Sequence, residues 1–256
     1  MKIKYYFNRI INNKVKLTTI LLIFLYPIID IVLMLKDVSM GASVLEPNLA
    51  SFLSSRIFNS AQCLLLWFLP LYIILIVADD CIEDYKSGYR NVLISKWGKS
   101  SYVVTNMFKG FTFGFLVVFI SLAINLVMTQ IIFTGGNYTG LDTDTIEGIE
   151  NLRLSLQHPL LTNIKYILLA SLISGVVGLG ASSVSIILHD RFIVYPLVFV
   201  MWYIPNNVFT RPIILALQPF TEYSISDSSP AIIFVFLINL IVASVACVKE
   251  IKYAKI

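Results

Sequence analysis

A cluster of carboxylates lies at the end of the second long apolar run of this sequence. Its members are Asp79, Asp80, Glu83 and Asp84. Two carboxylates held close together can share a proton and act as general acid and base, so an acidic protease is one chemistry that the cluster suggests. Such a protease in a membrane needs paired aspartates within the bilayer, and Asp30 is the only acid inside a long apolar run. We therefore expect no enzymatic activity from this chain.

Metal chemistry is also poorly supported by the sequence. The two histidines, His158 and His189, are expected on opposite sides of a membrane and cannot share a zinc site. The three cysteines, Cys63, Cys81 and Cys247, have no paired spacing and lie in or beside apolar stretches. We expect them to be packing residues, with no bound metal.

A short segment resembles the end of a phosphate-binding loop. Gly98, Lys99 and Ser100 fit that motif, but it requires a glycine five residues earlier, where this chain has Leu93. No strand is expected before it. The sequence therefore predicts no cofactor on this chain, and any ATP and Mg²⁺ must be bound by a partner.

The elements that position these residues are expected to cross a membrane. Hydrophobic residues make up 57% of the 256 residues, charged residues 13%, and the mean hydropathy is +0.82. The apolar residues form runs at 17–35, 61–78, 111–133, 166–188, 192–204 and 231–248. The fifth run is short, and the others are long enough to cross. We predict an all-α polytopic membrane protein that forms one domain over residues 1–256, with six transmembrane helices.

The distribution of lysine and arginine predicts the orientation. With the N-terminus inside, 14 of the 19 basic residues fall in inner segments, namely Lys2, Lys4, Arg9, Lys14, Lys16, Lys86, Arg90, Lys96, Lys99, Lys109, Arg191, Lys249, Lys252 and Lys255. The other five, Lys36, Arg56, Arg153, Lys165 and Arg211, are outer. We predict a multi-pass protein of the cell membrane with both termini in the cytoplasm and no nucleic-acid partner.

Three segments outside the spans have their own character. Residues 1–16 mix basic and apolar residues, as in an amphipathic helix on an anionic membrane surface or a plain flank of the first span. Residues 134–164 form a long outer loop that contains Asp142, Asp144, Glu147 and Glu150. Residues 205–230, with several prolines, are too short to cross and predict a re-entrant or interfacial pair of outer helices.

The cytoplasmic loop 79–110 is expected to be folded. Val92, Leu93 and Trp97 nearly align on one face of a short helix, which would suit a protein partner or would rest on lipid.

The loop carries a resemblance to a known family. The acidic cluster, the Glu83-x-x-x-x-Gly88 element, the helix around Leu93 and the Ser95-Lys96 step resemble the first cytoplasmic loop of type-II ABC exporter permeases. The six spans, the basic N-terminal helix and the broken segment with Gln218–Tyr223 before the last span are similar to that family over nearly the whole chain. The resemblance implies a coupling helix that docks on a separate nucleotide-binding ATPase subunit. The residues to which it assigns this role are Glu83, Asp84, Gly88, Val92, Leu93, Trp97 and Lys99.

Two further features lie within the spans. Asp30 is an acid at membrane depth, where burial of a charge costs free energy and such residues are often functional. It is a candidate for the substrate path. Alternatively, it bonds to a neighbouring helix or reaches the outer interface. The fourth run carries Ala170, Ser174, Gly178 and Ser182 at four-residue intervals. Such a stripe predicts close helix packing, within this chain or with a second subunit.

Together these features predict the permease subunit of an ABC transporter that exports a hydrophobic or amphipathic substrate, such as a peptide, a lipid-like molecule or a drug. A second permease copy or a homologous permease would complete the path. Export and self-protection against a peptide antibiotic both stay open. The alternative is a membrane anchor or immunity protein that binds a partner without transport.

Overall fold

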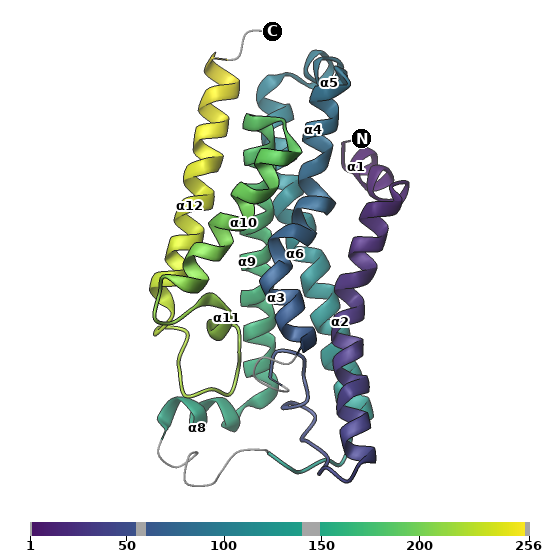
Figure 1. Ribbon diagram of the computed structural model, residues 1–256, viewed down its shortest axis with the longest axis vertical. Helices are drawn as coiled ribbons and strands as arrows, with labels where there is room; N and C mark the ends of the chain where they lie inside the picture. The colour runs from purple at the N-terminus through teal and green to yellow at the C-terminus, as the bar shows by residue number, and fades with distance from the viewer. Residues whose placement is uncertain (1, 55–59, 140–148, 254–256) are drawn as a thin grey trace.

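The chain folds into a helical bundle, seen here in a computed structural model that describes residues 2–54, 60–139 and 149–253 (Figure 1). Its helices are α1 (Lys2–Ile11), α2 (Lys14–Ser39), α3 (Ser60–Ile73), α4 (Asp79–Lys86), α5 (Tyr89–Trp97), α6 (Lys99–Ile132), α8 (Glu150–Gln157), α9 (Pro159–Leu188), α10 (Arg191–Asn207), α11 (Ile213–Ala216) and α12 (Ser229–Val248). Two π-helical turns, η1 (Ile74–Ala78) and η2 (Lys249–Tyr253), follow α3 and α12. The predicted all-α class is confirmed.

Five helical segments are long and apolar enough to cross a membrane. They are Lys14–Ser39, Ser60–Lys86, Lys99–Ile132, Pro159–Leu188 and Ser229–Lys252 among the described residues. The helix at the predicted fifth span, α10, has 17 residues and contains Pro196 and Pro205. A polytopic membrane protein is thus confirmed, and a full crossing by α10 stays a prediction.

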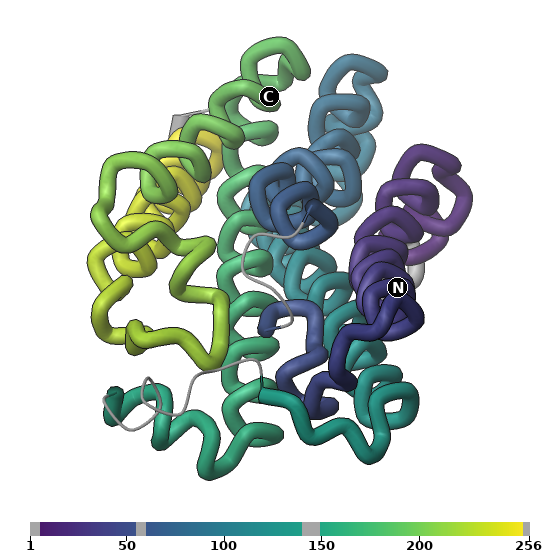
Figure 2. The backbone as a smooth tube through the Cα atoms, turned by 60° about the horizontal axis from the view of Figure 1, so that its bottom comes forward, coloured from purple at the N-terminus to yellow at the C-terminus, as the bar shows by residue number. Residues whose placement is uncertain are grey.

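Helix α9 runs through the middle of the bundle (Figure 2), and 78% of its most apolar window is buried. The predicted stripe on this helix is Ala170, Ser174, Gly178 and Ser182, all buried. The stripe lies against α6 of the same chain, where a Cβ on Gly178 would stand 2.3 Å from the carbonyl oxygen of Gly110. The Ser174 hydroxyl donates to the Gly114 carbonyl at 2.9 Å. Small side chains on both helices allow this close approach.

The second span is irregular before it reaches the carboxylates. Pro70 has no N–H, so the carbonyl of Leu66 lacks its partner within the helix. The indole Nε1 of Trp202 on α10 donates to that carbonyl at 3.1 Å. The π-helical turn Ile74–Ala78 follows and leads directly into α4. Turns of this kind are frequent at functional sites.

The N-terminal segment differs from a single helix over 1–16. Helix α1 ends at Ile11, and α2 begins at Lys14. Tyr6 and Ile10 are 2% and 5% exposed, whereas Phe7 is 53% exposed. One side of α1 therefore packs against the protein, and Lys14 and Lys16 belong to the first span.

The segments that the sequence predicts to be outer are only partly described. Asp142, Asp144 and Glu147 lie outside the described residues, and α8 follows from Glu150. In residues 205–230 the predicted pair of helices is wrong, because a single short helix, α11, forms there. Ile213 and Leu217 are fully buried, so this segment folds back against the bundle.

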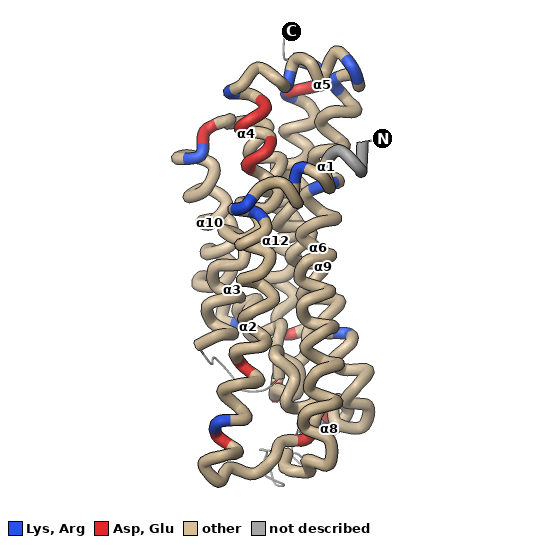
Figure 3. The backbone as a smooth tube through the Cα atoms, turned by 90° about the vertical axis from the view of Figure 1, so that its right-hand side faces the viewer, with Lys and Arg blue, Asp and Glu red and all other residues tan. Residues whose placement is uncertain are grey.

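Both described chain ends lie at the same end of the bundle as α1, α4 and α5 (Figure 1). Charged residues gather at this end, and the middle of the bundle is nearly free of them (Figure 3). This separation is the pattern of a membrane-embedded bundle.

Candidate functional site

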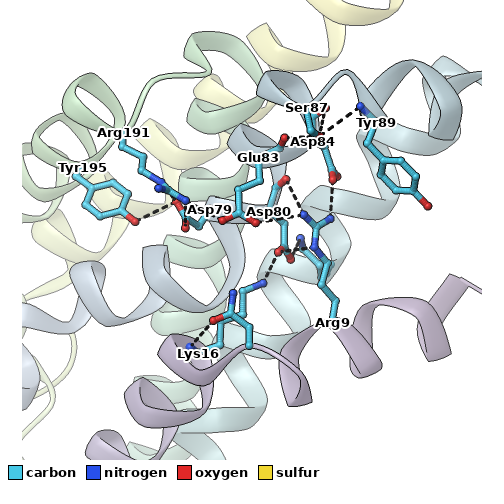
Figure 4. Close-up of polar contacts among 12 residues, drawn as sticks. Arg9, Lys16, Asp79, Asp80, Glu83, Asp84, Ser87, Tyr89, Arg191 and Tyr195 are labelled. Atoms are coloured by element: carbon cyan, nitrogen blue, oxygen red, sulfur yellow. Dashed lines mark hydrogen bonds and ion pairs between the residues drawn. The ribbon is translucent and has the colours of Figure 1, made fainter.

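The carboxylates Asp79, Asp80, Glu83 and Asp84 form one charged cluster on α4, here called the acidic hub (Figure 4). Residues four apart share a face of a helix, so these acids form two pairs on adjacent sides of α4. Asp80 and Asp84 are each 1% exposed and turn toward the bundle, whereas Glu83 is 45% exposed. The hub is therefore mostly internal, although the sequence placed it in a cytoplasmic loop between two spans.

Asp80 is the centre of the hub because three cations from three helices reach it. Arg9 Nε of α1 lies 2.9 Å from Asp80 Oδ1, and Lys109 Nζ of α6 lies 3.0 Å from Oδ2. The ammonium group of Lys16 on α2 also pairs with Oδ1. Both lysine side chains are 2% exposed. Charges so far from water are tolerated only when they are paired and hydrogen-bonded.

Arg9 binds more than one member of the hub. Its Nη1 donates to Asp84 Oδ1 at 2.7 Å, and its Nη2 lies 3.5 Å from Glu83 Oε2. The planar guanidinium has several donors in fixed directions, which suits contact with several carboxylates at once. Arg9 thereby fixes α1 to α4.

The other side of the hub binds α10. Arg191 donates to both oxygens of Asp79 at 2.5 and 2.6 Å and to Glu83 at 2.8 Å. The Tyr195 hydroxyl donates to Asp79 at 3.2 Å. The hub thus connects α4 with four helices: α1, α2, α6 and α10.

Helix α5 follows α4 through a tight turn. Gly88 has φ of 72°, a left-handed conformation that glycine adopts without a Cβ clash. Leu93 is 2% exposed, whereas Val92 is 54% exposed and Trp97 is half-buried against Tyr6, with ring centroids 6.1 Å apart. The prediction that Val92, Leu93 and Trp97 share one exposed face is wrong, because adjacent residues point about 100° apart on a helix.

The outward side of α5 is formed by other residues. Tyr89, Val92 and Lys96 are exposed, and Tyr85 at the end of α4 is 49% exposed. Arg90 instead turns inward and pairs with Glu250 near the C-terminus.

His189 follows the last residue of α9 and lies against the end of α4. Its ring stacks on Tyr85 with centroids 3.7 Å apart. Burial, and then the positive charges of Arg90 and Lys249, lower the pKa of His189 to about 4. The imidazole is therefore neutral at pH 7.

The predicted site residues divide between surface and interior. Glu83 is half-exposed, Gly88 is exposed at the turn, and Lys99 begins α6. Asp84 and Leu93 are buried, so they are unsuited to direct contact with a partner. The hub cations Arg9, Lys16, Lys109 and Arg191 were not among the predicted site residues. The sequence has 19 basic residues, and nothing in their local spacing distinguishes these four.

A groove of about 650 Å³ runs along α4 beside the hub. Its lining residues are Arg9, Ile82, Glu83, Asp84, Lys86, Ser87, Tyr89 and Arg191. Within the described ranges no three histidine, cysteine or acidic side chains converge as metal ligands. The arrangement can bind charged groups and holds several helices together through ion pairs.

Asp30, the predicted substrate-path residue, lies inside α2 and is 2% exposed. Pro27, one turn earlier, leaves the carbonyl of Ile23 without its helical N–H, and the Ser121 hydroxyl of α6 donates to it at 3.0 Å. Asp30 therefore faces protein rather than lipid, and its role in a path stays a prediction.

The fold and the hub define an α-helical polytopic membrane protein with a charged cluster joining its helices at one end. Over 248 residues, or 96% of each chain, the sequence is 35% identical to the uncharacterized protein YybM of Bacillus subtilis (strain 168). The chain belongs to the same family as YybM. No family model and no solved structure matches it.

Proposed function

We propose that this protein is the permease subunit of an ABC-type exporter, driven by a separate ATPase subunit that binds ATP and Mg²⁺. The observation that supports this most is the attachment of α5 to the bundle. Helix α4 precedes α5 directly, and its carboxylates bind cations of α1, α2, α6 and α10. A movement of α5 would reach four other helices through short ionic contacts, as a transport cycle between two states requires.

The docking surface in this proposal is the outward side of α5. We define the docking tip as Tyr85, Lys86, Tyr89, Val92 and Lys96, all exposed. Leu93 and Trp97, which the family resemblance also assigned to docking, would instead hold α5 to the bundle. The hub would act as a connecting element rather than as a contact for the partner.

The topology of the proposal has six crossings. Helix α10 would form the fifth span, and both termini would face the cytoplasm of the cell, in line with the 14 inner and five outer basic residues. Two copies of this chain, or one copy and a homologous permease, would enclose the path. The spans that would line this path carry mainly aliphatic and aromatic side chains, which favour a hydrophobic or amphipathic substrate.

Co-purification tests the proposal. The tagged protein is isolated from its native membrane in mild detergent, together with Val92→Glu and a matched control, Val208→Glu. Val92 is 54% exposed at the docking tip, and Val208 is 71% exposed at the end of α10 remote from the hub. We expect a stoichiometric ATPase with the wild type and the control and its loss with Val92→Glu.

Two results would contradict this expectation. If no ATPase accompanies the wild type under any condition, the exporter proposal fails, and a membrane anchor or immunity protein becomes the better explanation. If Val92→Glu retains the ATPase, the docking tip is wrongly placed. Gel filtration of each variant shows whether it is folded, so a lost partner can be told from a lost fold.

A further inference from the structure

The charge of the docking tip indicates what kind of surface it meets. Residues 85–100 contain four cations and no acid. Of these cations, Arg90 is neutralised by Glu250, and Lys99 is only partly exposed at the start of α6. Lys86 is 57% exposed, with Asp190 at 3.9 Å, and Lys96 is exposed. The surface that α5 presents is therefore cationic.

The arrangement of the tip adds an apolar component. Tyr89, Val92 and Lys96 are spaced i, i+3 and i+7, which places them on one side of α5. Tyr89 is 41% and Val92 54% exposed. A lysine beside an aromatic and an aliphatic side chain is complementary to a cleft with an apolar floor and carboxylates on its rim.

The groove beside the docking tip also favours a negatively charged partner. Lys86 and Tyr89 belong to its lining, and it continues to Arg191 and Arg9. Its acids, Glu83 and Asp84, already accept hydrogen bonds or ion pairs from these arginines. The charged side chains that line the groove are three cations and two acids, so their excess positive charge favours an incoming carboxylate over an incoming cation.

We infer that the docking tip binds an acidic cleft of the ATPase subunit and that a carboxylate of that subunit enters the groove between α4 and α10. This inference rests on the function proposed above and specifies the chemistry of its partner. An anionic membrane surface is negatively charged like the acidic cleft, so the experiment must distinguish binding to the ATPase from binding to the membrane.

The test compares two charge reversals of equal size. Lys86→Glu/Lys96→Glu changes the tip, and Lys36→Glu/Lys165→Glu makes the same change at two exposed positions at the opposite end of the bundle. ATPase binding to each immobilised permease is titrated in detergent without anionic lipid, at low and high salt. We expect the tip variant to bind about tenfold or more weakly, which corresponds to about 1.4 kcal/mol, and the control to match the wild type. Binding of the wild type should weaken as salt rises.

The outcomes separate the two proposals. If the wild type binds no ATPase, the proposed function itself fails. If the wild type and both variants bind equally well, the acidic cleft is wrong while the permease assignment stands. A dependence on Lys86 and Lys96 that arises only in nanodiscs with anionic lipid would assign these lysines to the membrane and overturn the inference.

Discussion

Replacing Asp80 with asparagine removes the charge on which three helices converge. The substitution keeps the shape of the side chain but leaves Lys16 and Lys109, each 2% exposed, without their carboxylate. Arg9 retains Asp84 and Glu83. Breaking a buried ion pair by removing one partner costs about 3–5 kcal/mol. Because the amide oxygen can still accept one hydrogen bond, we expect about 3 kcal/mol, a more than hundredfold fall in the ratio of folded to unfolded protein.

Thiol labelling measures this effect in detergent. Cys81 is 1% exposed, next to Asp80, and becomes reactive when the bundle opens. A background with Cys63→Ser and Cys247→Ser assigns the signal to Cys81 alone. The control is Asp190→Asn, because Asp190 is 43% exposed and its ion-pair distance to a lysine is 3.9 Å. An exposed pair of this kind contributes about 0–1 kcal/mol.

A rescue variant makes the reasoning refutable. Asp80→Asn combined with Lys16→Met and Lys109→Met leaves no unpaired buried ammonium group, so stability should largely return. The electrostatic account fails if Asp80→Asn unfolds within about 1 kcal/mol of the wild type, or if the triple variant is no more stable than Asp80→Asn.

Three further predictions follow from other contacts. Gly178→Ala should lower the free energy of unfolding by about 1–3 kcal/mol, because its Cβ would stand 2.3 Å from a carbonyl oxygen of α6. Gly175→Ala should cost less, because no atom would stand closer than 3.0 Å to its Cβ, and thermal unfolding of both variants compares them. As pH falls from about 6.5 to about 4, the unfolded chain binds a proton at His189 that the folded chain does not, so stability should decrease over this window, and melts of His189→Asn should lack that part of the decrease. Trp202→Phe should destabilise the protein by about 1–3 kcal/mol in the same melts, because the carbonyl that Pro70 leaves free in α3 loses its donor.

The positions of the helices follow from the sequence because apolar run length is a direct physical requirement. Residues 17–35, 61–78, 166–188 and 231–248 each fall within a helix that is long enough to cross, and the run 111–133 extends one residue beyond such a helix. The run at 192–204 was the weak one, and its helix, α10, is the one too short to qualify. Helix propensity and hydropathy depend on neighbouring residues, so a single sequence is sufficient to predict where the long helices lie.

The acidic hub was less predictable because it depends on rotation and on distant residues. Hydropathy assigned Asp84 to a cytoplasmic loop, yet α4 continues the second span and turns Asp84 inward. Val92 and Leu93 are neighbours in sequence, and a small rotation of α5 decides which of them is exposed. The partner Arg9 is 75 residues away from Asp84 in the sequence. No local pattern specifies such a pair.

The acidic hub is a cluster of buried charges at one end of a bundle whose middle is apolar, and its presence there requires an explanation. A buried ion pair is often no more stabilising than apolar side chains of similar size, so stability alone does not account for Asp80 and its three cations. The pairs instead connect α4 to α1, α2, α6 and α10 at definite atoms, which apolar packing of interchangeable methyl groups does not do. In the proposed function, helices held in this way would move together when a partner displaces α5, which follows α4 through the turn at Gly88.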